Sequence, residues 1–358
     1  MGLEGKMDAA RSAADTLVDA LRPGDRFALV SFDDEARVVS PGALYTGDAA
    51  RLHALVAGLR DDGGTNLWDG LGAGHAELAE AAGAGARKVL LVSDGNANVG
   101  ETEPGAFAAL ARGWAAGGVT VSAVGLGRDF NETLLEDVAD AGGGTYRFVG
   151  DPDELPAVIE DELQRTTETV ARGLRVTLRA EGGAVLHEVY GWNESRAADG
   201  VQVDVGEIAA GQSRKIVVAV TVPTEEPGES PLLTADLRYV SLEGEHGEAS
   251  AAAAATVVDD PAAVDASADR AATIDATRAR AGEIARTAAD SYRIGEPERA
   301  AGLLRSAARF VDNAARATGA PELVEASRNI AELEALGAAE GGAYAAKAAS
   351  EAGRDFAR

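Results

Sequence analysis

Two hydrophobic periodicities alternate over the first 168 residues. Apolar positions recur at helical spacing over residues 3–22 and 48–60, whereas residues 26–32 and 88–94 are apolar runs of strand length. The second run, KVLLVSD, is continuous, which is typical of a strand buried on both faces of a parallel sheet. Alternating helices and strands predict an α/β fold with a mainly parallel sheet for residues 1–168. We expect further helices near 67–82, 104–116, 131–141 and 152–168, and further strands near 36–40, 119–126 and 144–149.

The pattern changes near residue 170. Several short segments now show period-two alternation, separated by Gly, Pro, Asn and Asp turns, which predicts an antiparallel β-sandwich over 169–258. The expected strand segments are GLRVTLRAE, AVLHEVYGW, VQVDVGEI, RKIVVAVTV, LLTADLRYV and ASAAAAATV.

From residue 259 to 358 the chain is rich in Ala and Arg. Gly295-Glu296-Pro297 and Gly319-Ala320-Pro321 interrupt a helical pattern, with Pro in or near the first turn that follows each break. This part is predicted to be a helical hairpin or small bundle. We expect its helices at 262–293, 296–318 and 321–336, with a further one after Gly342.

Composition restricts the classes of partner and chemistry. The net charge of −26 disfavours binding to nucleic acid or anionic lipid, because both are polyanions. The chain has no cysteine, so disulfides and thiolate sites are excluded, and its four histidines form no pair at helical spacing. We see no apolar run long enough for a transmembrane helix and no signal peptide. The sequence as it stands indicates a cytoplasmic protein, although a missing upstream segment could carry an export signal.

Two loops carry candidate ligand chemistry. Thr65 lies in the loop Gly63-Gly64-Thr65-Asn66 between two expected helices, and Asp94 ends the apolar run at 88–94. Ligands of open α/β sheets bind beyond the carboxyl ends of the strands. A Thr hydroxyl and an Asp carboxylate are hard oxygen donors that suit Mg²⁺ or Mn²⁺. Each residue also has a simpler interpretation, Thr65 as a helix N-cap and Asp94 as a turn residue.

The order of these segments resembles von Willebrand factor A domains, in the bacterial form in which a β-sandwich follows. The resemblance rests on RPGDRFALVSF, DDGGTNLWDGL, KVLLVSDGNANVG, VTVSAVGLG and LLEDVADAGGGTYRFV. It implies a Rossmann-like, doubly wound fold with a metal-ion-dependent adhesion site for Mg²⁺ or Mn²⁺. Thr65 and Asp94 match two of the three loops of that site.

The third loop of the family site, DxSxS at the end of the first central strand, has no match in this sequence. The resemblance places Met1 just past that motif, so the domain is expected to lack its first central strand. Two remaining ligands compete poorly with water for Mg²⁺, so this chain is expected to bind the metal weakly or not at all. Three explanations stay open: a longer protein that starts upstream, direct closure of the flanking strands, or a strand supplied by a partner.

Neighbouring residues have both a site interpretation and a structural one. Asp62 and Asp69 flank the Thr65 loop as candidate substitute ligands, although a solvated face is the simpler interpretation. Trp68 is expected to pack in the core or at the rim of the site. Candidate partner contacts on the adjoining loops are Asn96, Asn98, Asp129, Asn131 and Glu132.

No catalytic arrangement stands out in the sequence. We find no Ser-His-Asp set, no HExxH motif and no phosphate loop, so the chain is interpreted as a binding protein rather than an enzyme. One hypothesis is an adhesion-type or scaffold module that binds an acidic side chain of a protein partner through the metal. The alternative is a metal-independent scaffold or assembly factor with a degenerate A domain.

Overall fold

The computed structural model describes residues 5–60, 63–79, 85–127 and 130–357, and its contacts group into two compact units. The first unit contains residues 1–174, 206–212 and 239–247, and the second contains 175–205, 213–238 and 248–358. The division into three domains at 168 and 258 remains a prediction. Up to residue 167 the elements are α1 (Lys6–Ala20), β1 (Arg26–Phe32), β2 (Ala36–Leu44), α2 (Ala49–Ala57), α3 (Leu67–Ala79), β3 (Lys88–Ser93), α4 (Pro104–Ala116), β4 (Thr120–Leu126), α5 (Glu132–Ala141), β5 (Gly143–Val149), a 3-10 turn (Pro152–Glu154) and α6 (Leu155–Thr167).

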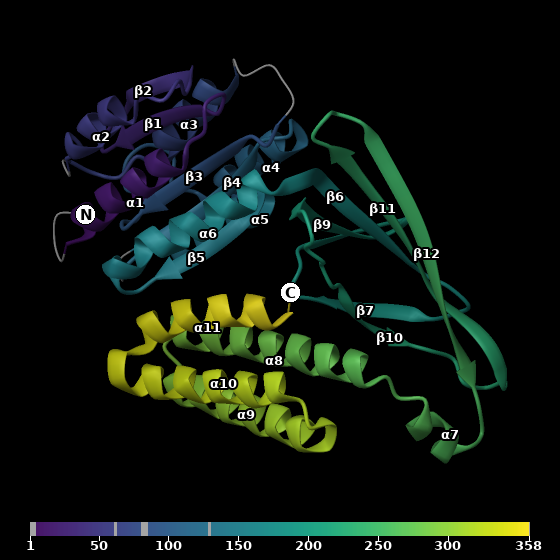
Figure 1. Ribbon diagram of the computed structural model, residues 1–358. Coiled ribbons are helices and arrows are strands. Elements are labelled where there is room, and N and C mark those ends of the chain that lie inside the picture. Colours follow the sequence, from purple (N-terminus) through teal and green to yellow (C-terminus); the bar gives the residue numbers. More distant parts are fainter. Residues whose placement is uncertain (1–4, 61–62, 80–84, 128–129, 358) are drawn as a thin grey trace. The chain divides into compact units, whose positions relative to one another are not determined.

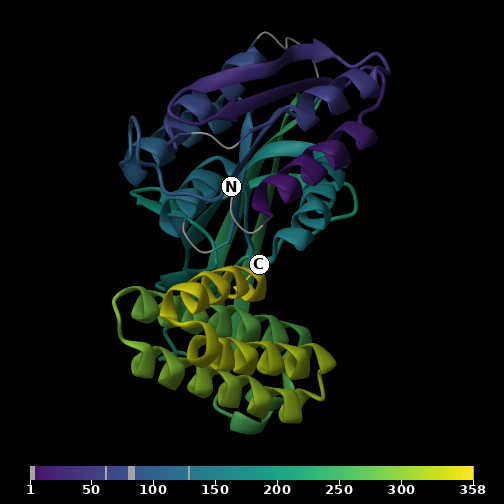
Figure 2. The ribbon, with the colours of Figure 1, turned by 90° about the vertical axis from the view of Figure 1, so that its left-hand side faces the viewer.

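A parallel sheet in the order β3-β4-β5 forms the centre of the first unit (Figure 1). The middle strand, β4, is buried along its whole length. Val121 and Ala123 pack in a cluster with residues of α4 and α5, whereas Val124 and Leu126 pack with residues of α1 and α6. Alternate side chains of β4 therefore meet helices on opposite faces. The expected α/β class is confirmed, and α1 lies beside α6 in Figures 1 and 2.

The hairpin β1–β2 is a separate antiparallel sheet. Among the described residues, no strand pairs with β1 on its other side, nor with β3 on the side away from β4. Both strands nevertheless pack against α3, since Phe32 of β1 and Val89 and Leu91 of β3 share a cluster with Leu67 and Leu71. The structure thus shows separation rather than direct closure of these two strands.

The position of β3 at an edge changes its burial. Its sequence predicted a strand buried on both faces, but only Leu91 and Ser93 of β3 are fully buried, and the remaining side chains are half-buried. The apolar run does form a strand, as expected. Among the described residues β3 pairs with a strand on one side only, and part of its apolar surface is accessible.

The strands that follow form two sheets, one in the order β12-β11-β6-β9-β8 and the other a β7–β10 pair. Each of the six expected segments is a strand, and the sequence missed only β8, which is short and exposed. Side chains from both sheets, among them Leu178, Leu186 and Val203, form one hydrophobic cluster. The strands are β6 (Thr169–Ala180), β7 (Val185–Tyr190), β8 (Glu194–Ala197), β9 (Gly200–Ala209), β10 (Val217–Thr221), β11 (Gly228–Ser241) and β12 (His246–Val257).

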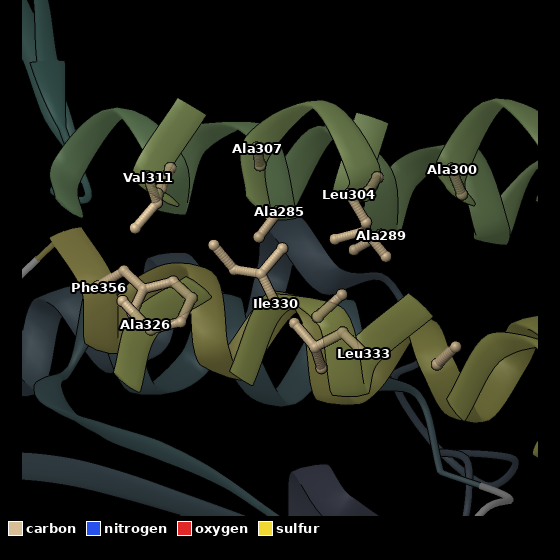
Figure 3. Close-up of a cluster of buried hydrophobic side chains, with 14 of the residues drawn as sticks. Ala285, Ala289, Ala300, Leu304, Ala307, Val311, Ala326, Ile330, Leu333 and Phe356 are labelled. Carbon is tan, nitrogen blue, oxygen red and sulfur yellow. The ribbon is translucent and has the colours of Figure 1, made fainter. Parts of the chain in front are cut away.

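The C-terminal part is helical, as expected. Leu304 and Val311 of one helix and Ile330 and Leu333 of another meet across a core that is otherwise mostly alanine (Figure 3). Small side chains let the helix axes approach closely, which compensates for the scarcity of aromatic residues. The helices are α7 (Pro261–Ala266), α8 (Arg270–Arg293), α9 (Pro297–Thr318), α10 (Pro321–Glu340) and α11 (Gly342–Ala357).

The prediction of a single helix over 262–293 is wrong, because the structure has two helices there. α7 ends at Ala266 and α8 begins at Arg270. The Asp269 carboxylate accepts hydrogen bonds from the backbone N–H groups of Ala271 and Ala272, which caps the new helix. Asp is a favoured N-cap residue, and this local signal competes with the helical periodicity.

Candidate functional site

The crest of the first unit consists of three loops, residues 33–35, 63–66 and 94–100. Thr65 is held between the other two loops. Its backbone N–H donates to Asn98 Oδ1 at 2.7 Å, and its carbonyl accepts from the Asn98 N–H at 3.1 Å. A Cβ atom added to Gly95 would lie 2.9 Å from Thr65 Oγ1. The structure therefore brings the Thr65 hydroxyl against the loop that carries Asp94.

Asp34 braces the other side of the Thr65 loop. Its Oδ1 atom accepts a hydrogen bond from the Gly64 N–H at 2.9 Å, and its carbonyl accepts from Asn66 Nδ2 at 3.0 Å. A Cβ atom at Gly64 would lie 2.6 Å from the same Asp34 oxygen, so the close approach requires glycine. The glycines in the GGTN sequence thus allow the loops to interlock.

Asp94 directly follows β3, at the carboxyl end of the parallel sheet. The preceding Ser93 is buried, and its hydroxyl accepts from the Gly95 N–H at 3.4 Å, which tightens the turn. Asp94 Oδ2 lies 3.7 Å from the ammonium of Lys6, the first residue of α1. Lys6 was not among the site residues predicted from the sequence. Its position at the start of a helix and 88 residues before Asp94 left no local signal.

The described crest residues do not fit a Mg²⁺ or Mn²⁺ site. Mg²⁺ takes near-octahedral oxygen coordination, whereas Thr65 and Asp94 supply one hydroxyl and one carboxylate, and the carboxylate already faces an ammonium. Across residues 5–60, 63–79, 85–127 and 130–357, no three His, Cys, Asp or Glu side chains come together to form a metal-binding group. The metal role expected for Thr65 and Asp94 remains a prediction.

The other candidate residues near the crest have mainly structural contacts. Asp69 Oδ2 accepts from the Ala36 N–H at 2.7 Å, which joins α3 to the β1–β2 turn. Trp68 packs edge-on against Phe107 in the core, with ring centroids 5.3 Å apart. Asn131 caps α5 by accepting from the Leu134 N–H. Asn96 and Asn98 are exposed, Glu132 is buried, and Asp62 and Asp129 lie outside the described residues.

A second polar group, which the sequence analysis missed, lies at the opposite end of the parallel sheet. We call it the base cluster, and its centre is the Lys88 ammonium, which lies 2.7 Å from Glu162 Oε1 and 2.5 Å from Glu207 Oε1. Burial alone would lower the pKa of Lys88, but the two carboxylates raise it above its usual value. The remaining members are Thr120, Ser122 and Thr145, whose hydroxyls donate to the carboxylates.

The base cluster is closed to ligands because its polar groups are already satisfied. Ser122 donates to Glu162 at 2.5 Å, Thr145 donates to the other Glu162 oxygen at 2.6 Å, and Thr120 donates to Glu207 at 3.0 Å. The Lys88 side chain is 8% exposed. Such a group holds α6 and the start of β3 together, and we assign it a structural role.

Comparison with known proteins agrees with the α/β fold of the first unit. The family model for the von Willebrand factor type A domain matches residues 3–161, and this part of the chain is therefore a von Willebrand factor type A domain. An uncharacterized Escherichia coli protein, YfbK, is 25% identical over 224 residues, which are 61% of this chain and 39% of that protein. A Synechocystis protein, sll0103, also uncharacterized, is 23% identical over 245 residues, 65% of this chain and 57% of that protein. The chain thus spans about half the length of these relatives or less.

Solved structures show that the fold is shared over nearly the whole chain. A von Willebrand factor type A protein from Catenulispora acidiphila has a TM-score of 0.71 at 22% identity and covers 91% of this chain and 78% of its own. The ArnB paralog VWA2 from Sulfolobus acidocaldarius has a TM-score of 0.60 at 17% identity and covers 100% and 86%. At these identities the likeness concerns the fold. No helix in the described part of the chain is both long and apolar enough to cross a membrane.

Proposed function

We propose that this chain is a non-enzymatic protein-interaction module, and that the crest is its docking surface. Von Willebrand factor type A domains commonly mediate protein interactions, and residues 3–161 form such a domain. The crest stands at the carboxyl ends of the sheet strands, where open α/β sheets bind their ligands. It presents exposed polar side chains from Asp34, Asn96 and Asn98.

The interlocked hydrogen bonding of the crest loops is the observation that carries this proposal. Thr65 is tied to Asn98 on one side, and Gly64 is tied to Asp34 on the other. Loops that are already ordered lose little conformational entropy when a partner binds. A braced polar surface on a rigid sheet is therefore well suited to recognising one partner surface.

We further propose that docking at the crest works without a divalent metal. The resemblance suggested Mg²⁺ or Mn²⁺, completed by an acidic side chain of the partner. Among the described residues no group of three or more His, Cys, Asp or Glu side chains could hold a metal ion, and the predicted ligand Asp94 lies 3.7 Å from the Lys6 ammonium, which favours the metal-independent alternative. In a form of the protein with more oxygen ligands at the crest, the metal-dependent interpretation would apply to Thr65 and Asp94.

Site-specific photo-crosslinking tests the docking surface. A photo-reactive amino acid replaces Asn96 at the crest or, as a control, Ala116, which is exposed at the end of α4 near the amino ends of the strands. After irradiation in a lysate of the organism that makes the protein, we expect one protein to be enriched from position 96 and not from 116. That enrichment should disappear when Asp34→Ala and Asn98→Ala loosen the crest. Equal recovery from both positions would contradict the proposal.

The enzyme alternative has its own test. Steady hydrolysis of generic esters or phosphate esters that is lost in Asp94→Ala would show that the crest is catalytic. We expect the wild-type protein to show no turnover above that of the Asp94→Ala variant.

The strands and helices after residue 168 are proposed to act as a brace or oligomerisation element for the docking domain.

A further inference from the structure

A buried amine, that of Lys6, lies beside the crest residue Asp94. Lys6 is 6% exposed, and its Nζ atom lies 3.7 Å from Asp94 Oδ2 on a side chain that is 18% exposed. A buried charge requires a compensating partner, because removal from water is costly. We propose that the Lys6 ammonium is the resident cation of the crest, and that it compensates the Asp94 carboxylate in place of a divalent metal.

The Lys6 amine lies against a glycine. Gly127 directly follows β4, the strand next to β3, and has a φ of +78°. A Cβ atom at Gly127 would lie 2.8 Å from Lys6 Cε and 2.9 Å from Lys6 Nζ. The lysine arm therefore crosses the end of β4 to reach the carboxylate at the end of β3. Any larger residue at 127 would displace it.

Charge repulsion and ligand number then both disfavour a metal ion. A divalent cation bound to Asp94 would lie within a few ångströms of the ammonium, in a partly buried place where solvent screens poorly. The ammonium also contributes charge without demanding further ligands, whereas Mg²⁺ or Mn²⁺ needs more oxygen atoms than Thr65 and Asp94 provide. Lysine thus satisfies the carboxylate where the metal coordination would be incomplete.

This inference deepens the proposed function, since it states why docking at the crest needs no metal. Only its statement about docking rests on the proposed function, because docking requires a partner. Metal binding is measured on the protein alone. A failure of the crosslinking experiment therefore leaves the resident-cation proposal standing, and a failure of the metal experiment leaves the docking surface standing.

Mn²⁺ binding to the full chain tests the proposal directly. Free Mn²⁺ is followed by its electron paramagnetic resonance signal in wild type, Lys6→Met, Lys6→Arg and Lys6→Met/Asp94→Asn. Wild type and Lys6→Arg keep a cation beside Asp94, so we expect neither to take up Mn²⁺ at millimolar concentration. Lys6→Met keeps the aliphatic arm but removes the ammonium beside Asp94, so we expect its Mn²⁺ affinity to rise measurably above that of wild type. The double variant should lose that gain.

Thermal unfolding provides the second measurement. Lys6→Met and Asp94→Asn each remove one charge of the Lys6–Asp94 pair, so each lowers the Tm, whereas the double variant is less destabilised than the sum of the two. Millimolar Mn²⁺ should raise the Tm of Lys6→Met alone. Mn²⁺ binding by the wild-type protein that Asp94→Asn abolishes would overturn the proposal. This comparison needs no Lys6 variant, so it tests the proposal even where a Lys6 variant fails to fold. Strict additivity of the two single changes would also contradict it.

Discussion

The Lys88 ammonium lies 2.7 Å from Glu162 Oε1, although the two residues are 74 positions apart in the sequence. This pair and Glu207 form the buried centre of the base cluster. Lys88 begins β3, whose other end leads to Asp94 at the crest. One strand thus joins a closed polar group at one end of the sheet to the candidate docking surface at the other.

The base cluster predicts a large loss of stability in Lys88→Met. The substitution leaves the Glu162 and Glu207 carboxylates buried without a cation, and breaking a buried pair in this way costs about 3–5 kcal/mol. Urea unfolding of the full chain measures this loss. Lys215→Met is the matched control, because the Lys215 side chain is 59% exposed in its pair with Asp275, and surface pairs contribute about 0–1 kcal/mol. Equal losses from the two variants would refute a buried role for Lys88.

The same cluster predicts acid sensitivity. Burial alone would raise the pKa of Glu162, but the Lys88 ammonium and the Ser122 and Thr145 hydroxyls lower it below its usual value. A carboxyl group with a depressed folded-state pKa contributes stability that is present above the unfolded pKa, about 4.3, and lost as pH falls through the folded pKa.

We therefore expect the free energy of unfolding to fall with pH below about 5, with a shallower fall in Glu162→Gln. Urea midpoints measured across that pH range provide the comparison. Glu160→Gln, on the exposed side of the same helix, should keep the wild-type slope. A Glu162→Gln slope that matches wild type would show that Glu162 carries no shifted pKa.

The brace at Thr65 predicts local loosening in Asn98→Ala. The change removes the acceptor of the Thr65 N–H, and a typical hydrogen bond contributes about 0.5–1.5 kcal/mol. Amide hydrogen exchange of residues 63–66 should become faster while the exchange of β4 stays unchanged. Asn96→Ala, exposed on the same loop, is the control. Unaltered exchange at 63–66 in Asn98→Ala would mean that the brace does not order the loop.

Two helical glycines predict opposite effects in the C-terminal bundle. A Cβ atom at Gly337 would lie 2.1 Å from the hydroxyl of Tyr292, which is buried, whereas a Cβ atom at Gly302 meets open space. Gly302→Ala should stabilise by up to about 1 kcal/mol through helix propensity. Gly337→Ala should destabilise by about 1–3 kcal/mol through overpacking. Thermal unfolding compares the two, and a Gly337→Ala protein as stable as Gly302→Ala would show that Tyr292 yields freely.

Local patterns predicted nearly every element of the fold. Continuous apolar runs marked β3 and β4, Pro and Gly marked the breaks before α9 and α10, and the two loops that carry Thr65 and Asp94 were recognised from sequence. These features depend on neighbours in the chain, which is why they are readable from it. The break at Asp269 was missed because one capping side chain outweighed a helical periodicity that continues through it.

The lysine contacts could not be predicted because they depend on residues far apart in sequence. Lys88 meets Glu207 across 119 positions, and Lys6 meets Asp94 across the sheet. One signal was nevertheless present. The chain uses lysine at only four positions, and the side chains of Lys6, Lys88 and Lys347 are buried. In a chain whose other cations are nearly all arginine, the scarce lysine is thus concentrated at buried positions.

The most direct test of a metal-independent docking surface is the crosslinking yield from position 96 with EDTA present, compared with the yield in millimolar Mg²⁺. Because the Lys6 ammonium already compensates Asp94, we predict the same partner at the same yield in both conditions. A yield that collapses in EDTA and returns with Mg²⁺ would contradict the account and establish a metal-dependent adhesion site instead.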